Sequence, residues 1–118
     1  MKLNLQKIGN IAVVALETEI INNHKFKANI RPILENYKNL IFDMRQVKLI
    51  DTYGCAALLT CLRKLNKAGG ELKLFGVCKP TRTLFELVRM HRIVEIFNTK
   101  EEAVNSYEIV FASFIANP

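Results

Sequence analysis

Four consecutive residues with different chemistry stand at one point of the chain: Asp51, Thr52, Tyr53 and Gly54. They follow the apolar end of a strand-like run and precede an amphipathic segment. At a strand-to-helix joint the first helical N–H groups have no partner within the helix. Asp51 or Thr52 can accept from one of them as an N-cap, and Gly54 lets the first turn approach another backbone or a ligand. The residues therefore predict a capped helix start.

The hydroxyl of Thr52 also suits a charge switch. A phosphate at a helix N-terminus is stabilised by free N–H groups and by the helix dipole. Phosphorylation would add about −1.5 to −2 charges at pH 7 without breaking the helix, so it would change what can dock. A purely structural role for this threonine, as a helix cap, stays open as the alternative.

Patterns typical of enzymes do not occur in the sequence. It contains no G-x-S-x-G elbow, no P-loop lysine signature, no H-E-x-x-H and no G-x-G-x-x-G. Asp43 and Asp51 each end an apolar run, and as a pair they would suit general acid–base work, whereas separately each is a cap. We read His24 and His91 as surface residues. The sequence therefore predicts a protein that is not an enzyme.

Composition excludes several other classes. The three cysteines form no C-x-x-C pair, so we expect neither a zinc site nor another cofactor, and we read the cysteines as small hydrophobic residues in a reducing cytoplasm. We find no secretory signal and no apolar run of the roughly 18 residues that a membrane span needs. The net charge is +6, and residues 60–100 carry nine Lys/Arg against three Glu. Without base-stacking aromatic residues in this basic flank, nucleic acid is not expected as a partner.

The elements that position the joint follow from periodicity. The 118 residues are long enough for one domain, and strands alternate with helices as in an α/β sheet. A turn at Gly9-Asn10 predicts a hairpin or two short strands around a turn. Pro32 falls inside a helical pattern and predicts a bend near residue 30 or two short helices. We expect further strands at 39–44, 47–50, 71–77 and 93–97, and helices over 24–40, 55–67, 80–90 and 99–115, the last with a Thr99–Glu102 capping box.

Residues 39–104 resemble the STAS domain of bacterial anti-sigma factor antagonists. The resemblance rests on an apolar strand ending in Asp43, followed by Ile50-Asp51-Thr52-x-Gly54 at a helix start. It continues with Ala68-Gly69-Gly70-Glu71, with Leu84 and Leu87, and with Glu101-Glu102-Ala103. It implies one STAS domain over residues 1–118, with a mixed β-sheet of four to five strands flanked by about four helices.

The resemblance also implies a function and a site. Thr52 matches the Ser/Thr that a partner kinase phosphorylates in this family, with Asp51, Tyr53, Gly54 and Asp43 as partner-binding and supporting residues. The unphosphorylated protein is expected to bind an anti-sigma factor that is also a Ser/Thr kinase, which frees a sigma factor for transcription. Phosphorylation breaks the complex, and a phosphatase resets it. The implied location is the bacterial cytoplasm.

The chain departs from the family pattern at four places. Tyr53 stands where a second Ser or Thr is common, and Ala56 and Arg89 each replace a usual glycine. The segment from Thr18 to Ile21 lacks the aspartate that helps to contact the kinase. These departures bear on the identity of the partner more than on the fold.

Two other functions stay open. One is a non-catalytic STAS subunit of a larger assembly, either a lipid-transport ABC complex or a stress-sensing scaffold; the apolar stretch "IVFASFI" and the basic flank favour such docking. The other is binding of a nucleotide or another small molecule by the basic residues after Thr52, although nothing in their spacing demands it.

Overall fold

A five-stranded mixed sheet forms the centre of the protein, of which a computed structural model describes residues 2–107, apart from the side chains of residues 23 and 24. The strand order is β1-β2-β4-β6-β7. The strands are β1 (Lys2–Ile8), β2 (Ile11–Glu17), β4 (Asn39–Asp43), β6 (Glu71–Phe75) and β7 (Glu95–Phe97). β1 and β2 are antiparallel, and the other pairs are parallel. The predicted hairpin is confirmed, because Ile8 pairs with Ile11 across the turn.

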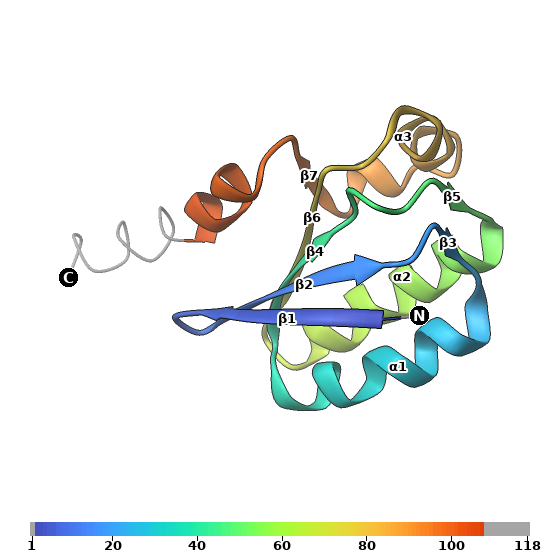
Figure 1. Cartoon of the computed structure of the whole chain (residues 1–118). Helices are drawn as coiled ribbons and strands as arrows, with labels where there is room; N and C mark the ends of the chain where they lie inside the picture. Colours follow the sequence, from blue (N-terminus) through green and yellow to red (C-terminus); the bar gives the residue numbers. More distant parts are fainter. Residues whose placement is uncertain (1, 108–118) are drawn as a thin grey trace.

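Helices cover both faces of this sheet, which confirms the predicted α/β class (Figure 1). The helices are α1 (Asn23–Asn36), α2 (Thr52–Lys67), α3 (Lys79–Leu87), the short 3₁₀ turn η1 (Met90–Arg92) and a last helix from residue 100 that is described as far as residue 107. The remainder of the helix predicted over 99–115 lies outside the described residues. A second, two-stranded parallel sheet joins β3 (Ile20–Ile21) to β5 (Leu49–Ile50).

The larger core lies between the sheet and helices α1 and α2. It includes Phe42 of β4, Phe26 of α1 and Leu58 of α2, each at most 1% exposed. One face of α2 packs on this core: Cys55, Leu58, Leu62 and Leu65 are buried, and Leu59 is partly buried against the same core. Gly69, with a φ of +83°, ends α2 in the left-handed conformation that favours glycine.

α1 continues as one helix through Pro32, so the expectation of two short helices is wrong. Pro32 removes one N–H donor, but Phe26 and Ile30 are buried on the sheet, and this tertiary packing holds the helix. The Asn36 side chain also donates to the carbonyl of Pro32 at 2.7 Å.

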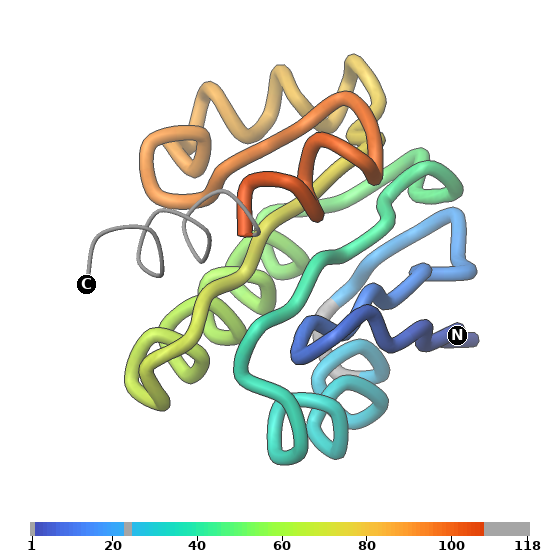
Figure 2. Tube along the Cα trace, turned by 90° about the vertical axis from the view of Figure 1, so that its left-hand side faces the viewer, coloured from blue at the N-terminus to red at the C-terminus, as the bar shows by residue number. Residues whose placement is uncertain are grey.

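The opposite face of the sheet is covered by the last helix. Figure 2 looks onto this face, with the last helix in front of the strands and α2 behind them. Buried Lys73 of β6 reaches the helix, where its Nζ lies 2.6 Å from the Ser106 hydroxyl and 4.2 Å from the centre of the Tyr107 ring. The Tyr107 hydroxyl lies within 3.0 Å of the carbonyls of Leu40 and Glu71, and its single proton is shared between them. Burial raises the pKa of Tyr107, so the hydroxyl stays protonated at neutral pH.

The end of α3 differs from the usual family pattern. Arg89, which replaces a glycine there, has a φ of +62° and a ψ of +24°, in the left-handed region. This conformation costs a non-glycine residue about 1–2 kcal/mol, and the extra chain entropy of glycine offsets about half of that.

An Arg89→Gly variant is therefore expected to be more stable by about 0.5–1 kcal/mol, as measured by urea unfolding. Arg63→Gly, at an exposed helical position of α2, is the matched control and should lose about 1 kcal/mol. Equal losses in both variants would contradict the assignment of strain to residue 89.

Candidate functional site

The structure shows which residue at the strand-to-helix joint caps α2. Asp51 is the N-cap, and its Oδ1 accepts from the Gly54 N–H at 2.7 Å. Thr52 is the first helical residue and is exposed. Among the hydrogen bonds of residues 2–107, none uses the Thr52 hydroxyl. The carboxylate thus does the capping, and the hydroxyl faces solvent at the positive end of the helix dipole.

Gly54 brings the first turn of α2 against the small sheet. A Cβ atom at this position would lie 2.6 Å from the carbonyl oxygen of Ile21 and 2.5 Å from Cγ1 of Ile50. Since real Cβ atoms do not approach a backbone oxygen so closely, only glycine fits here. The glycine therefore fixes where Thr52 sits relative to β3 and β5.

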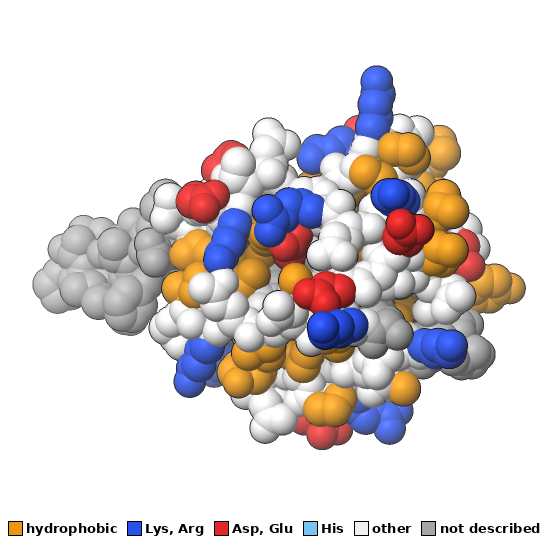
Figure 3. Space-filling view, viewed as in Figure 1, with side chains coloured by type: hydrophobic (Ala, Val, Ile, Leu, Met, Phe, Trp, Pro, Cys, Tyr) orange, Lys and Arg blue, Asp and Glu red, His pale blue; other side chains and the backbone are white. Residues whose placement is uncertain are grey.

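An exposed apolar patch lies beside the threonine, made of Ile20, Leu49 and Tyr53. Ile20 and Leu49 are register partners in the small sheet, while their neighbours Ile21 and Ile50 are buried. The exposed fractions are 53% for Ile20, 60% for Leu49 and 65% for Tyr53. Figure 3 shows hydrophobic side chains on the side of the molecule that carries β3, β5 and α3. Large hydrophobic residues that are exposed close to one another in this way are typical of an interaction surface.

Charged residues border the same patch. The exposed Glu19 and Lys48 form an ion pair with Nζ 3.4 Å from Oε1. The backbone holds them together, because the Glu19 carbonyl accepts from the N–H groups of Lys48 and Leu49 at 2.8 and 2.9 Å. The Thr18–Ile21 segment therefore presents an exposed carboxylate, that of Glu19, at the border of the patch.

Sequence reasoning missed Glu19, Ile20, Lys48 and Leu49. Strands of two residues carry no periodicity, so only the pairing of β3 with β5 could have revealed this surface. A faint signal exists in the apolar pairs Ile20-Ile21 and Leu49-Ile50, because a strand with one buried face needs only one apolar residue of each pair.

Asp43 does not join the other predicted site residues. It shares the sheet face of Ile41, which packs under the last helix, whereas Leu40 and Phe42 face α1 and α2. Its carboxylate is held by Arg45, which donates from Nε at 3.0 Å and from Nη2 at 2.8 Å. The hydrogen bonds and charge of Asp43 raise the pKa of Arg45. The two aspartates thus have different partners, and no acid–base pair forms from Asp43 and Asp51.

The remaining polar candidates show no arrangement for chemistry. Cys55 and Cys61 are buried, and burial raises the pKa of each thiol, for Cys61 to about 12. His91 is exposed, and the side chain of His24 lies outside the described residues. Within residues 2–107, no group of three or more His, Cys, Asp or Glu side chains is placed to hold a metal ion. In the same range no helix is both long and apolar enough to cross a lipid bilayer.

Known proteins with this architecture include anti-sigma factor antagonists and parts of anion transporters. The chain is 20% identical over 73 residues to an anti-sigma F factor antagonist of Paenibacillus polymyxa, an alignment that covers 62% of each protein. Among solved structures, an anti-sigma factor antagonist of Thermotoga maritima matches with a TM-score of 0.77 and 21% identity, over 88% of this chain and 92% of that one. The phosphorylated form of the Bacillus cell fate determinant SpoIIAA matches with a TM-score of 0.67 and 18% identity, over 90% and 99%.

At these sequence identities, the structural similarities show the fold alone. The family itself is shown by the sequence, since the model of the STAS domain matches residues 2–103, a range that includes the five-stranded sheet and the capped joint at Asp51. By this match over most of its length, the chain belongs to the STAS domain family.

Proposed function

We propose that this chain is a protein-binding regulatory module that docks an anti-sigma factor Ser/Thr kinase and is released by phosphorylation of Thr52. The observation that carries the proposal is that Asp51 caps the helix, so that Thr52 is not needed as a cap and is left exposed. A kinase can then modify the hydroxyl without removing a bond that holds the fold.

The surroundings of Thr52 support the same proposal. The patch of Ile20, Leu49 and Tyr53 offers apolar area to a partner, and Glu19 and Lys48 give it a polar rim. A phosphate on Thr52 would have to be desolvated beside this apolar patch when a partner docks. It would also stand next to the carboxylate of Asp51. Both effects disfavour the complex and leave the folded domain intact.

A phosphorylation assay tests the first step. The chain is incubated with ATP and lysate of its source cells, and the intact mass is measured. We expect one added phosphate on wild type and on Thr52→Ser, none on Thr52→Ala, and one on the matched control Thr83→Ala, which removes an exposed hydroxyl of α3. A phosphate that persists in Thr52→Ala, or no phosphate on any variant, would refute the switch.

The exposure of the patch also favours a second candidate, a non-catalytic subunit of a larger assembly such as a lipid-transport ABC complex or a stress-sensing scaffold. In that case Ile20, Leu49 and Tyr53 stay covered by a permanent partner. Size-exclusion chromatography of the natively purified chain separates the two functions. A stable complex that is insensitive to ATP and phosphatase would favour the subunit, and a complex lost after incubation with ATP would favour the switch.

A further inference from the structure

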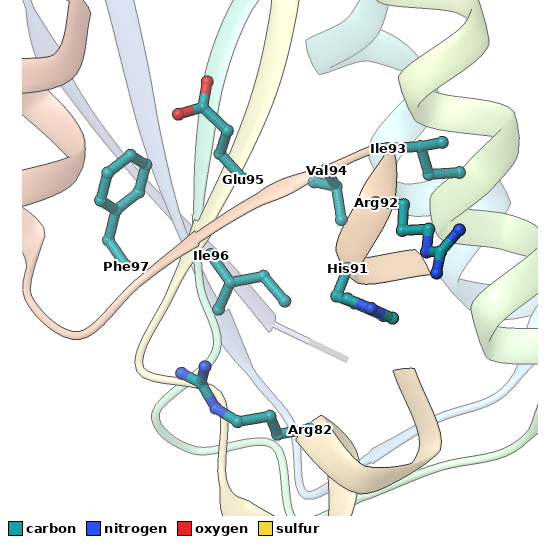
Figure 4. A pocket seen from close by; sticks show the side chains of 8 residues that line it. All are labelled: Arg82, His91, Arg92, Ile93, Val94, Glu95, Ile96 and Phe97. Carbon is teal, nitrogen blue, oxygen red and sulfur yellow. The ribbon is translucent and has the colours of Figure 1, made fainter. Parts of the chain in front are cut away.

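A groove of about 410 Å³ runs beside β7 (Figure 4). β7 is one edge strand of the five-stranded sheet, and β1 is the other. The groove lies between β7, the turn η1 and helix α3. Its lining includes Arg82 of α3, His91 and Arg92 of η1, Ile93 directly after η1, and Ile96 of β7. None of these belongs to the joint at Thr52.

The floor of the groove is an open strand edge. β7 is the last strand of the sheet and pairs only with β6. The Phe97 carbonyl points inward, since it accepts from the Gly76 N–H at 3.2 Å. Backbone groups of successive residues point to opposite sides of a strand, so the N–H and C=O of Ile96 point out of the sheet into the groove. An added strand could pair with these two groups.

The walls of the groove are basic. Arg82 and Arg92 line it, and neither makes an ion pair among the described residues. Glu95, the one acidic residue of the lining, is directed away from both arginines in Figure 4. Its carboxylate lies 3.5 Å from the Nζ of buried Lys73. Residues 79–93 carry four Lys/Arg against one Glu, so the surrounding surface is basic as well.

Exposed apolar side chains also lie on the elements that border the groove. Ile93 lines the groove and is 52% exposed, and Leu87 and Val88 at the end of α3 are 76% and 43% exposed. A folded monomer gains nothing from exposing three large hydrophobic residues within seven positions. Together with the strand edge and the arginines, they fit a ligand that is extended, acidic and partly apolar.

We propose that the β7 groove binds an extended acidic segment of a partner protein, which adds to the sheet as a sixth strand. The main chain of the segment pairs with the N–H and C=O of Ile96. Because side chains of a strand alternate between two sides, the carboxylates of alternate residues meet Arg82 and Arg92 together. The surface is independent of the Thr52 switch and allows a second partner to be held at the same time.

Fluorescence anisotropy with synthetic peptides tests the proposal on the whole chain. The probe is a labelled peptide of alternating Glu and Val. Two further peptides serve as comparisons, one with Lys in place of every Glu and one with every backbone amide N-methylated, so that neither edge can donate to a strand. Inorganic phosphate is the competitor that reports simple anion binding.

We expect the Glu/Val peptide to bind wild type and to shift the amide resonance of Ile96 in an ¹⁵N spectrum. The double variant Arg82→Glu/Arg92→Glu should weaken binding about tenfold or more. The matched double variant Arg63→Glu/Lys64→Glu, on the exposed face of α2, should change it less than threefold. Thr52→Asp should bind as wild type does, so failure here is distinguishable from failure of the switch.

Three results would overturn the proposal. Equal binding of the N-methylated peptide, or displacement by millimolar phosphate, would reduce the groove to an anion site without strand addition. Equal losses of peptide binding in the two double variants would show that the peptide is attracted by the net charge of the protein alone. Absence of binding by the Glu/Val peptide would remove the acidic segment as the occupant.

Discussion

A Thr52→Asp variant is expected to bind the proposed partner, an anti-sigma factor kinase, about 100-fold more weakly than wild type, which corresponds to about 2.7 kcal/mol. The carboxylate would stand in the first turn of α2, beside exposed Tyr53 and the carboxylate of Asp51. A docked partner would have to remove water from this carboxylate, and the patch residues Ile20, Leu49 and Tyr53 carry no positive charge to compensate for the lost hydration. Isothermal titration calorimetry with the purified kinase measures the loss.

The stability of the same variant should stay within about 0.5 kcal/mol of wild type. An anion in the first turn of a helix is stabilised by the dipole, and repulsion from Asp51 offsets that gain. Thr52→Asn, which has the same shape and no charge, is the matched control and should retain binding to within about threefold. Equal loss of binding in Asp and Asn variants would show that shape, and not charge, excludes the partner, and would contradict a phosphate-operated switch.

A Gly54→Ala variant is expected to lose about 2–3 kcal/mol of unfolding free energy. The direction of this change in unfolding free energy is informative. Alanine is a better helix former than glycine by about 1 kcal/mol, so it would stabilise α2 if the space around residue 54 were open. The added methyl would instead lie 2.6 Å from the carbonyl oxygen of Ile21, which the β3–β5 pairing holds in place. Urea unfolding followed by circular dichroism gives the difference.

Function should fall together with stability in this variant. The first turn of α2 must move away from β3, and Thr52 moves with it relative to Ile20 and Leu49. We therefore expect weaker binding of the kinase at temperatures where the variant remains folded. Ala56→Ser, at an exposed position of the same helix, is the control and should change stability by about 0.5 kcal/mol or less. A Gly54→Ala variant that is as stable as wild type would contradict the tight contact.

The order of elements could be predicted from the sequence because it is encoded locally. The apolar run ending in Asp43 has the length and pattern of a buried strand, and the stripe from Cys55 to Leu65 has the period of a helix. Local hydrogen bonds could be foreseen in the same way. The Thr99 hydroxyl accepts from the Glu102 N–H at 3.2 Å, as the capping-box pattern predicts.

Pro32 and Arg89 show where local rules fail. A proline predicts a break, yet buried Phe26 and Ile30 keep α1 continuous, since packing outweighs one missing donor. Arg89 predicts no left-handed residue, yet the turn into η1 imposes one on it. In both cases the tertiary structure determines the backbone against the preference of the residue.

In the candidate site, too, some features follow from neighbouring residues and others from contacts between distant segments. By itself, the sequence determined that a carboxylate, a hydroxyl and a glycine meet at the start of a helix, because these residues are neighbours in the chain. Only the tertiary structure decided that Asp51 caps and Thr52 is free, and that Asp43 faces the other side of the sheet. It alone brought Ile20 beside Leu49, residues far apart in sequence, through pairing of two strands too short to leave a periodic pattern. Contacts between distant segments depend on how the whole chain packs, and that information is not present in any single stretch of sequence.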